Sequence, residues 1–117
     1  MEKDRVTRTD WKIEPMVNGT PIPYTATFDA DQFAILQQGV KPKEMEQKWF
    51  VYYEAPVLHF HRSWTGLPIF EVDLTPNADG ARVTAARCAL SNMKNTTAES
   101  AADMLEKLVS YLVLGRL

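Results

Sequence analysis

Two strand-like segments lie next to each other in the middle of the chain. Residues 48–54 are rich in aromatic and β-branched side chains, and residues 57–62 alternate between apolar and polar ones. The two residues between them match the length of a tight hairpin turn. With Glu54 opposite Val57, the other cross-strand pairs follow one by one. They are Tyr53 with Leu58, Tyr52 with His59, Val51 with Phe60, Phe50 with His61, and Trp49 with Arg62.

Two further segments extend this hairpin into an antiparallel meander of four strands. Residues 69–75 alternate again, and a turn at residues 76–80 leads into a last strand at residues 82–88, where Val83 and Ala85 are expected to point inward. The predicted inner face is apolar and the outer face is mixed. The outer face carries His59, His61, Glu71 and Asp73.

The segment before the meander predicts an edge strand and a short helix. Residues 22–28 alternate, and the prolines around them favour a sheet edge, where a missing N–H is tolerated. Asp29 and Gln32 have the spacing of a capping box at the start of a helix, and Gly39 is placed to end it.

The C-terminal segment predicts a long helix. Thr96 and Glu99 have the spacing of a second capping box, and apolar side chains then recur at helical spacing up to Gly115. The apolar stripe of this helix must pack on the sheet.

These elements define an α+β domain with an antiparallel sheet, made of a meander of four strands and an N-terminal edge strand, against a long C-terminal helix. Their order resembles that of the TATA-binding-protein-like and helix-grip folds, a likeness that implies no function. At 117 residues we expect a single domain, residues 1–117, with residues 1–14 as a mobile or loosely docked arm. Trp11 is the expected anchor of this arm.

Composition narrows the class of protein. The chain is 45% hydrophobic and 24% charged, as globular proteins are. Its net charge of −2 provides no positive field for a phosphate backbone, which argues against nucleic-acid binding. Cys88 is the only cysteine, so neither an internal disulfide nor a thiolate metal cluster is predicted. The charged start and the absence of a run of about 18 apolar residues predict a cytoplasmic protein without a membrane segment.

The central quarter of the chain resembles a known group of proteins. The segments Lys-Trp-Phe-Val-Tyr-Tyr-Glu at 48–54 and Leu-His-Phe-His-Arg-Ser-Trp-Thr-Gly at 58–66 are similar to those of small uncharacterised bacterial proteins with a His-Arg-Ser-Trp-Thr-Gly signature. The resemblance implies a bacterial source and no assigned activity. The group is expected to carry an aromatic residue where this chain has His59, which argues against a shared site there.

The main functional hypothesis concerns the turn after the second hairpin strand. Arg62, Ser63, Trp64 and Thr65 gather a cation, two hydroxyls and an indole, and Arg87 is expected on the same helix-covered face as Arg62. We predict a non-enzymatic domain that binds a small anionic ligand or a protein partner there. The alternatives are that each arginine snorkels to solvent, or pairs with a helix carboxylate (Glu99, Asp103 or Glu106), and that Trp64 folds back over Trp49.

Other chemistry has weaker support. His59 and His61 lack a third fixed metal ligand, so a solvated face with cross-strand histidine–carboxylate pairs is favoured, and no metal or cofactor is predicted. A hydrolase or lyase using His61 and a carboxylate is the enzymatic alternative. Ser63 as a nucleophile lacks an oxyanion donor, and Cys88 is expected to be a buried small side chain. Nucleic-acid contact through the sheet and self-association across an outer face carrying Phe50 and Tyr52 are further hypotheses.

Overall fold

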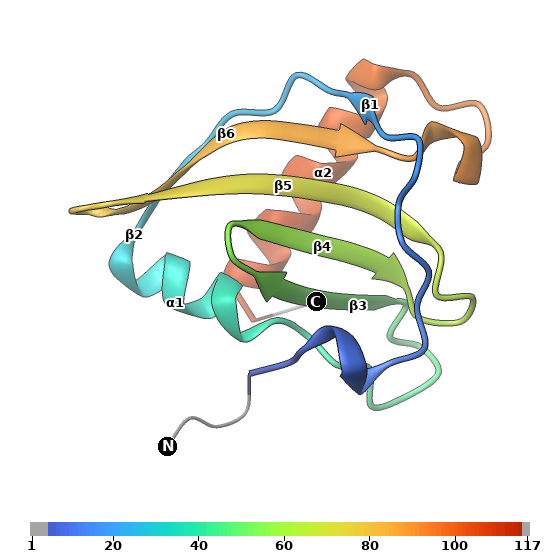
Figure 1. Ribbon diagram of the computed structural model, residues 1–117, viewed down its shortest axis with the longest axis horizontal. Coiled ribbons are helices and arrows are strands. Elements are labelled where there is room, and N and C mark those ends of the chain that lie inside the picture. Colours follow the sequence, from blue (N-terminus) through green and yellow to red (C-terminus); the bar gives the residue numbers. More distant parts are fainter. Residues whose placement is uncertain (1–4, 116–117) are drawn as a thin grey trace.

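The computed structural model describes residues 5–115 and confirms the α+β fold. Six strands form one antiparallel sheet in the order β1-β6-β5-β4-β3, with β2 also paired to β6 (Figure 1). The strands are β1 (Thr20–Pro21), β2 (Thr27–Asp29), β3 (Trp49–Glu54), β4 (Val57–Arg62), β5 (Pro68–Asn77) and β6 (Gly80–Cys88). The helices are α1 (Ala30–Gln38) and α2 (Ala98–Val113), with 3₁₀ turns η1 (Arg8–Asp10) and η2 (Leu90–Asn92).

The predicted hairpin register is confirmed at every pair. Glu54 lies opposite Val57, and the pairing continues without interruption to Trp49 opposite Arg62. The centre of the inner face of the hairpin is buried, with Val51 and Phe60 both 0% exposed.

The expected phase of β6 is wrong in its second half. Asp73 pairs with Ala85, but the next residue of β5, Leu74, pairs with Val83, so Thr84 is the extra residue of a β-bulge. Val83 points inward as predicted, whereas Ala85 is exposed. The bulge also turns Arg87 to the outer face, away from the helix. Alternation fails here because one extra residue reverses the side on which every later side chain lies.

The N-terminal edge strand is confirmed, but it is interrupted. β1 and β2 both pair with β6, and the residues between them make single bonds to it: the Ile22 amide donates to the Ala86 carbonyl (3.0 Å) and the Val83 amide to the Ala26 carbonyl (2.9 Å). Pro21 and Pro23 have no N–H to continue the ladder.

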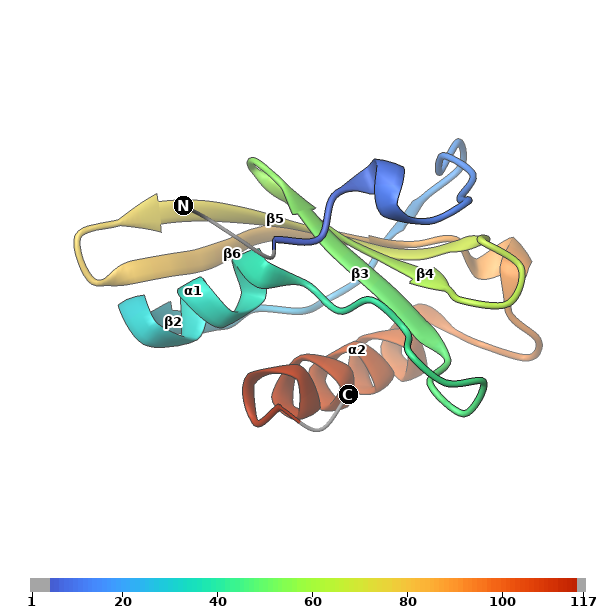
Figure 2. The ribbon, with the colours of Figure 1, turned by 90° about the horizontal axis from the view of Figure 1, so that it is seen from below.

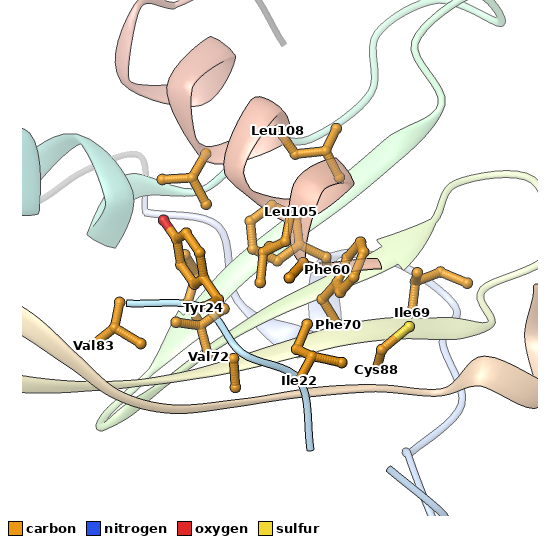
Figure 3. Packing of buried hydrophobic residues seen from close by; sticks show 14 of the residues in the cluster. Ile22, Tyr24, Phe60, Ile69, Phe70, Val72, Val83, Cys88, Leu105 and Leu108 are labelled. Atoms are coloured by element: carbon orange, nitrogen blue, oxygen red, sulfur yellow. The ribbon is translucent and has the colours of Figure 1, made fainter. Parts of the chain in front are cut away.

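The two helices begin at capping boxes, of which one was placed correctly. Asp29 caps α1 together with Gln32 as predicted, and Gly39 ends the helix with φ of 75°. The N-cap of α2 is Thr97, with Ser100 as its partner, one residue later than the predicted pair. Side chains of α2 pack on the sheet in the core shown in Figure 3. They are Ala101, Ala102, Leu105, Leu108, Val109 and Leu112.

The opposite face of the sheet is covered by the N-terminal arm, here residues 5–16. Figure 2 shows α2 on one side of the sheet and the arm with η1 on the other. Trp11 anchors it as expected, stacking on Phe50 at 5.7 Å between ring centroids and donating from Nε1 to the Ser63 carbonyl (2.8 Å). The Glu14 amide also donates to the Gly66 carbonyl (3.0 Å). The expectation of a solvated outer face is therefore wrong for the part that the arm covers, where Phe50 and His61 are buried.

Within residues 5–115, no helix is both long enough and apolar enough to span a membrane.

Candidate functional site

The turn between β4 and β5 displays some of the predicted residues and buries another. Trp64 is 69% exposed and is held by a hydrogen bond from Nε1 to the Met45 carbonyl (3.0 Å), so it is not folded over Trp49. Ser63 is buried; its hydroxyl donates to the Gln47 carbonyl (2.9 Å). Ser63 thus fixes the turn, and it has no free hydroxyl proton with which to serve a ligand.

Arg62, Trp64 and Thr65 line one pocket of about 250 Å³ together with Lys48. The Arg62 side chain is exposed at the end of β4, which agrees with the alternative that it snorkels to solvent. Its guanidinium carbon lies 5.1 Å from the centre of the Trp49 ring. Lys48 was missed as a site residue. The hairpin register could have indicated it, because one more pair beyond Trp49 and Arg62 places Lys48 opposite Ser63, and the Ser63 amide donates to the Lys48 carbonyl (2.9 Å).

A second, more apolar groove of about 480 Å³ lies against Trp64. Its walls include Trp11, Pro42 and Met45, and the Met45 residue is 72% exposed. Trp64 therefore stands between a basic pocket and an apolar groove.

Arg87 is not part of this turn. It lies on the outer face, where Nη2 and Nη1 donate to the two carboxylate oxygens of Asp73 (2.8 and 3.2 Å) and Nε donates to Glu71 (3.1 Å). The hydrogen bonds to Asp73 and then Glu71 raise the pKa of Arg87 against the opposing effect of burial. Two carboxylates already balance its charge, which leaves it poorly suited to hold a further anion.

A third cleft, of about 620 Å³, lies between the arm and the outer face of the sheet. Strands β3, β4 and β5 form its floor, and residues 8–16 form its roof and rim. Its lining residues are Arg8, Thr9, Trp11, Lys12, Ile13, Glu14, Pro15, Met16, Tyr52, His59, His61 and Glu71.

The floor of this cleft holds a stack of uncharged rings. Tyr52 stacks against both histidines, 4.4 Å from His59 and 5.8 Å from His61 between ring centroids, with interplanar angles of 7° and 17°. Burial, and then Glu54, raise the pKa of Tyr52 to about 12. Burial lowers the pKa of both histidines, partly opposed by Glu71 at His59 and by the Gly66 carbonyl at His61. At neutral pH the stack therefore carries no charge.

The two histidines have different partners. Nδ1 of His59 lies 3.4 Å from Glu71, which realises the predicted cross-strand pair. Nδ1 of His61 lies 3.1 Å from the Gly66 carbonyl. Since a carbonyl only accepts, the neutral His61 ring must carry its proton on Nδ1 and a lone pair on Nε2.

This arrangement limits the chemistry that the cleft supports. The ring centroids of His59 and His61 are 6.3 Å apart, and Nδ1 of each ring already lies against a partner, Glu71 for His59 and the Gly66 carbonyl for His61. No group of three ligating side chains that could hold a metal exists among residues 5–115. Burial raises the pKa of Cys88 to about 11, so this thiol, which lies on the helix side in the core, is not an activated nucleophile.

The fold and these pockets define a small α+β domain whose sheet is covered by helices on one face and, over part of the other face, by its own N-terminal arm. Comparisons with protein-family models, with curated proteins and with solved structures gave no match.

Proposed function

We propose that this protein is a non-enzymatic binding domain that takes a small anionic ligand at the pocket formed by Lys48, Arg62, Trp64 and Thr65. The observation that carries the proposal is the convergence of two cations, an exposed indole and a hydroxyl on one pocket of about 250 Å³. An anion with a planar group, such as a nucleotide or an aromatic acid, would meet all of these chemical groups.

The two cations are available for a ligand. Within residues 5–115, neither Lys48 nor Arg62 forms an ion pair. The Trp49 ring under Arg62 restricts its guanidinium, which can donate two parallel hydrogen bonds to a carboxylate or phosphate. The Thr65 hydroxyl accepts from the Leu67 amide (3.3 Å) and keeps its own proton to donate.

The Trp64 ring supplies a fixed, solvent-facing surface. Its bond to the Met45 carbonyl holds the indole in place before any ligand arrives, which reduces the entropy lost on binding. A planar ligand group stacked there would gain about 1–3 kcal/mol, the usual worth of base–aromatic stacking.

The test is a thermal-shift and fluorescence screen with nucleoside monophosphates, sugar phosphates and aromatic carboxylates as probes. A bound probe stabilises the folded state, and we expect Arg62→Ala or Lys48→Ala to weaken its affinity roughly tenfold to a hundredfold because a charge-assisted hydrogen bond is lost. Arg82→Ala is the matched control, since Arg82 is an exposed arginine in β6 outside this pocket. Binding that survives both pocket substitutions would refute the proposal.

A protein partner is the second candidate, favoured by the exposure of Met45 and Trp64 beside the apolar groove. A partner with an acidic and apolar segment would use both sides of Trp64. Its binding would depend on Met45, whereas that of a small anion would not.

We also propose a cytoplasmic, bacterial setting. It is supported by the single, buried thiol of Cys88, typical of a reducing compartment, and by the resemblance of the central segment to bacterial proteins.

A further inference from the structure

We infer, on the basis of the proposed function, that the ligand of the pocket at Trp64 carries two linked phosphates, as a nucleoside diphosphate does. The second phosphate occupies an adjoining pocket beside Lys94. In this arrangement the base stacks on Trp64. The first phosphate meets Lys48 and Arg62, and the second meets Arg62 and Lys94.

The adjoining pocket has a volume of about 280 Å³ and shares Arg62 with the pocket at Trp64. Arg62 therefore stands at the boundary between the two. Its guanidinium lies over the ring of Trp49, and Trp49 lines the adjoining pocket. Residues of η2 and of the segment that leads to α2 also line it, among them Asn92 and Lys94. A ligand held by Arg62 thus has space on both sides of the guanidinium.

The lining of the two pockets carries positive charge without a compensating negative one. The cations are Lys48, Arg62 and Lys94, and no aspartate or glutamate among the described residues lines either pocket. None of the three forms an ion pair within residues 5–115. Glu99 and Asp103, the acidic residues closest to Lys94 in the sequence, lie outside both linings. This charge favours a ligand with several negative charges over one with a single charge.

Hydrogen-bond donors are available for the second phosphate. A guanidinium presents its N–H groups in a fork, so the Arg62 side chain can donate to two neighbouring anionic groups at once. Asn92 uses one proton of Nδ2 for the Pro68 carbonyl (2.9 Å) and keeps the other. The Thr96 hydroxyl donates to the Lys94 carbonyl (2.9 Å) and therefore has no proton to offer.

The shared guanidinium also indicates why the two anionic groups should be linked. Two separate anions at Arg62 would repel each other, whereas the phosphates of one diphosphate are already held together by their bridging oxygen. Once the first phosphate is bound, the second meets its pocket at a high effective concentration. Trp49, Met93 and Met104 line the adjoining pocket as well, and apolar side chains that displace water strengthen the attraction between charges.

The experiment compares adenosine monophosphate with adenosine diphosphate as ligands of the full chain. Isothermal titration calorimetry gives the affinity and the number of ligands bound per chain. A magnesium-free buffer of constant ionic strength keeps the phosphates unpaired and the screening equal. We expect one diphosphate per chain, bound about fivefold to tenfold more tightly than the monophosphate because of the additional charge-assisted hydrogen bonds.

The variant Lys94→Ala tests the adjoining pocket. It should lower the affinity for the diphosphate about fivefold and that for the monophosphate less than twofold, because only the second phosphate meets Lys94. Lys107→Ala is the matched control, since Lys107 is an exposed lysine of α2 that lines neither pocket. It removes the same charge and should leave the ratio of the two affinities unchanged. A circular dichroism melt establishes that both variants are folded.

The results that overturn the inference differ from those that overturn the proposed function. Equal affinity for the two nucleotides, two diphosphates per chain, or the same loss in Lys94→Ala and Lys107→Ala would each refute the inference and leave the proposed function standing. Failure of both nucleotides to bind would also refute the inference. Nucleotide binding that survives both Arg62→Ala and Lys48→Ala would refute the proposed function and the inference together.

Discussion

At the scale of single residues, the two histidines should make the stability of the fold depend on pH. Burial lowers the pKa of His59 and His61 below their ordinary value of 6.5 in the folded chain. As the pH falls through that value, the unfolded chain takes up protons that the folded chain resists, so the free energy of unfolding decreases. The stabilising effect is therefore present above about pH 6.5 and is lost toward acid.

Urea unfolding at about pH 7.5 and pH 5.5 measures this effect, since no other side-chain type ordinarily titrates in that window. A variant carrying both His59→Asn and His61→Asn should lose less stability over the same interval than the unchanged chain. An equal loss in the two proteins would show that the histidines are not the groups responsible.

The observed positions of Arg62 and Arg87 show how far side-chain positions can be predicted from alternation along a strand. Arg62 was placed correctly because the hairpin register is fixed by turn length and by two alternating faces. Arg87 was predicted on the wrong face because Thr84 forms a bulge that no local residue pattern predicts. A count of alternating positions is reliable only up to the first irregularity in a strand.

At the scale of elements, two adjacent threonines at the start of α2 have different roles: Thr97 caps the helix and Thr96 does not. Thr97 accepts from the Ser100 amide (3.1 Å) and the Thr97 amide donates to the Ser100 hydroxyl (2.9 Å). Among residues 5–115, the Thr96 side chain makes one hydrogen bond, to the Lys94 carbonyl (2.9 Å). Thr97→Ala should therefore destabilise the protein by about 1 kcal/mol, the usual cost of losing a cap.

Thr96→Ala is the matched control and should change stability by less than about 0.5 kcal/mol, as is usual away from such features. Chemical denaturation of both variants decides the matter. If the Thr96 variant were the less stable one, the helix would begin one residue earlier, as its sequence first indicated.

The elements themselves were more predictable than their contacts. Both helices, the hairpin and the edge strand follow from alternation, capping residues and prolines, all of which act within a few residues. The docking of the arm does not. The sequence indicates that Trp11 anchors the arm. Nothing near it in the sequence specifies that it stacks on Phe50 or donates to the Ser63 carbonyl, 52 positions away. The cleft with His61 could not be predicted for the same reason.

At the scale of the whole molecule, the arm hides the outer face of β3 and the neighbouring part of β4 from solvent. Phe50, His61 and Tyr52 are 0%, 2% and 6% exposed, although they lie on the face opposite the helices. Self-association through this face would require the arm to leave it. The arm thus protects an apolar surface although only a few contacts hold it in place, chiefly those of Trp11 and the Glu14 amide.

Removal of residues 1–16 should therefore cause the protein to self-associate, because it exposes adjoining aromatic side chains of β3. Light scattering coupled to size-exclusion chromatography should show a mass that rises with concentration, in contrast to the full chain over the same range. Trp11→Lys, which keeps the arm and removes its anchor, should produce a weaker change of the same kind. If the truncated chain is folded by circular dichroism and keeps the mass of a single chain per particle at every concentration, the outer face does not drive association. The arm would then serve the cleft that it covers rather than the solubility of the sheet.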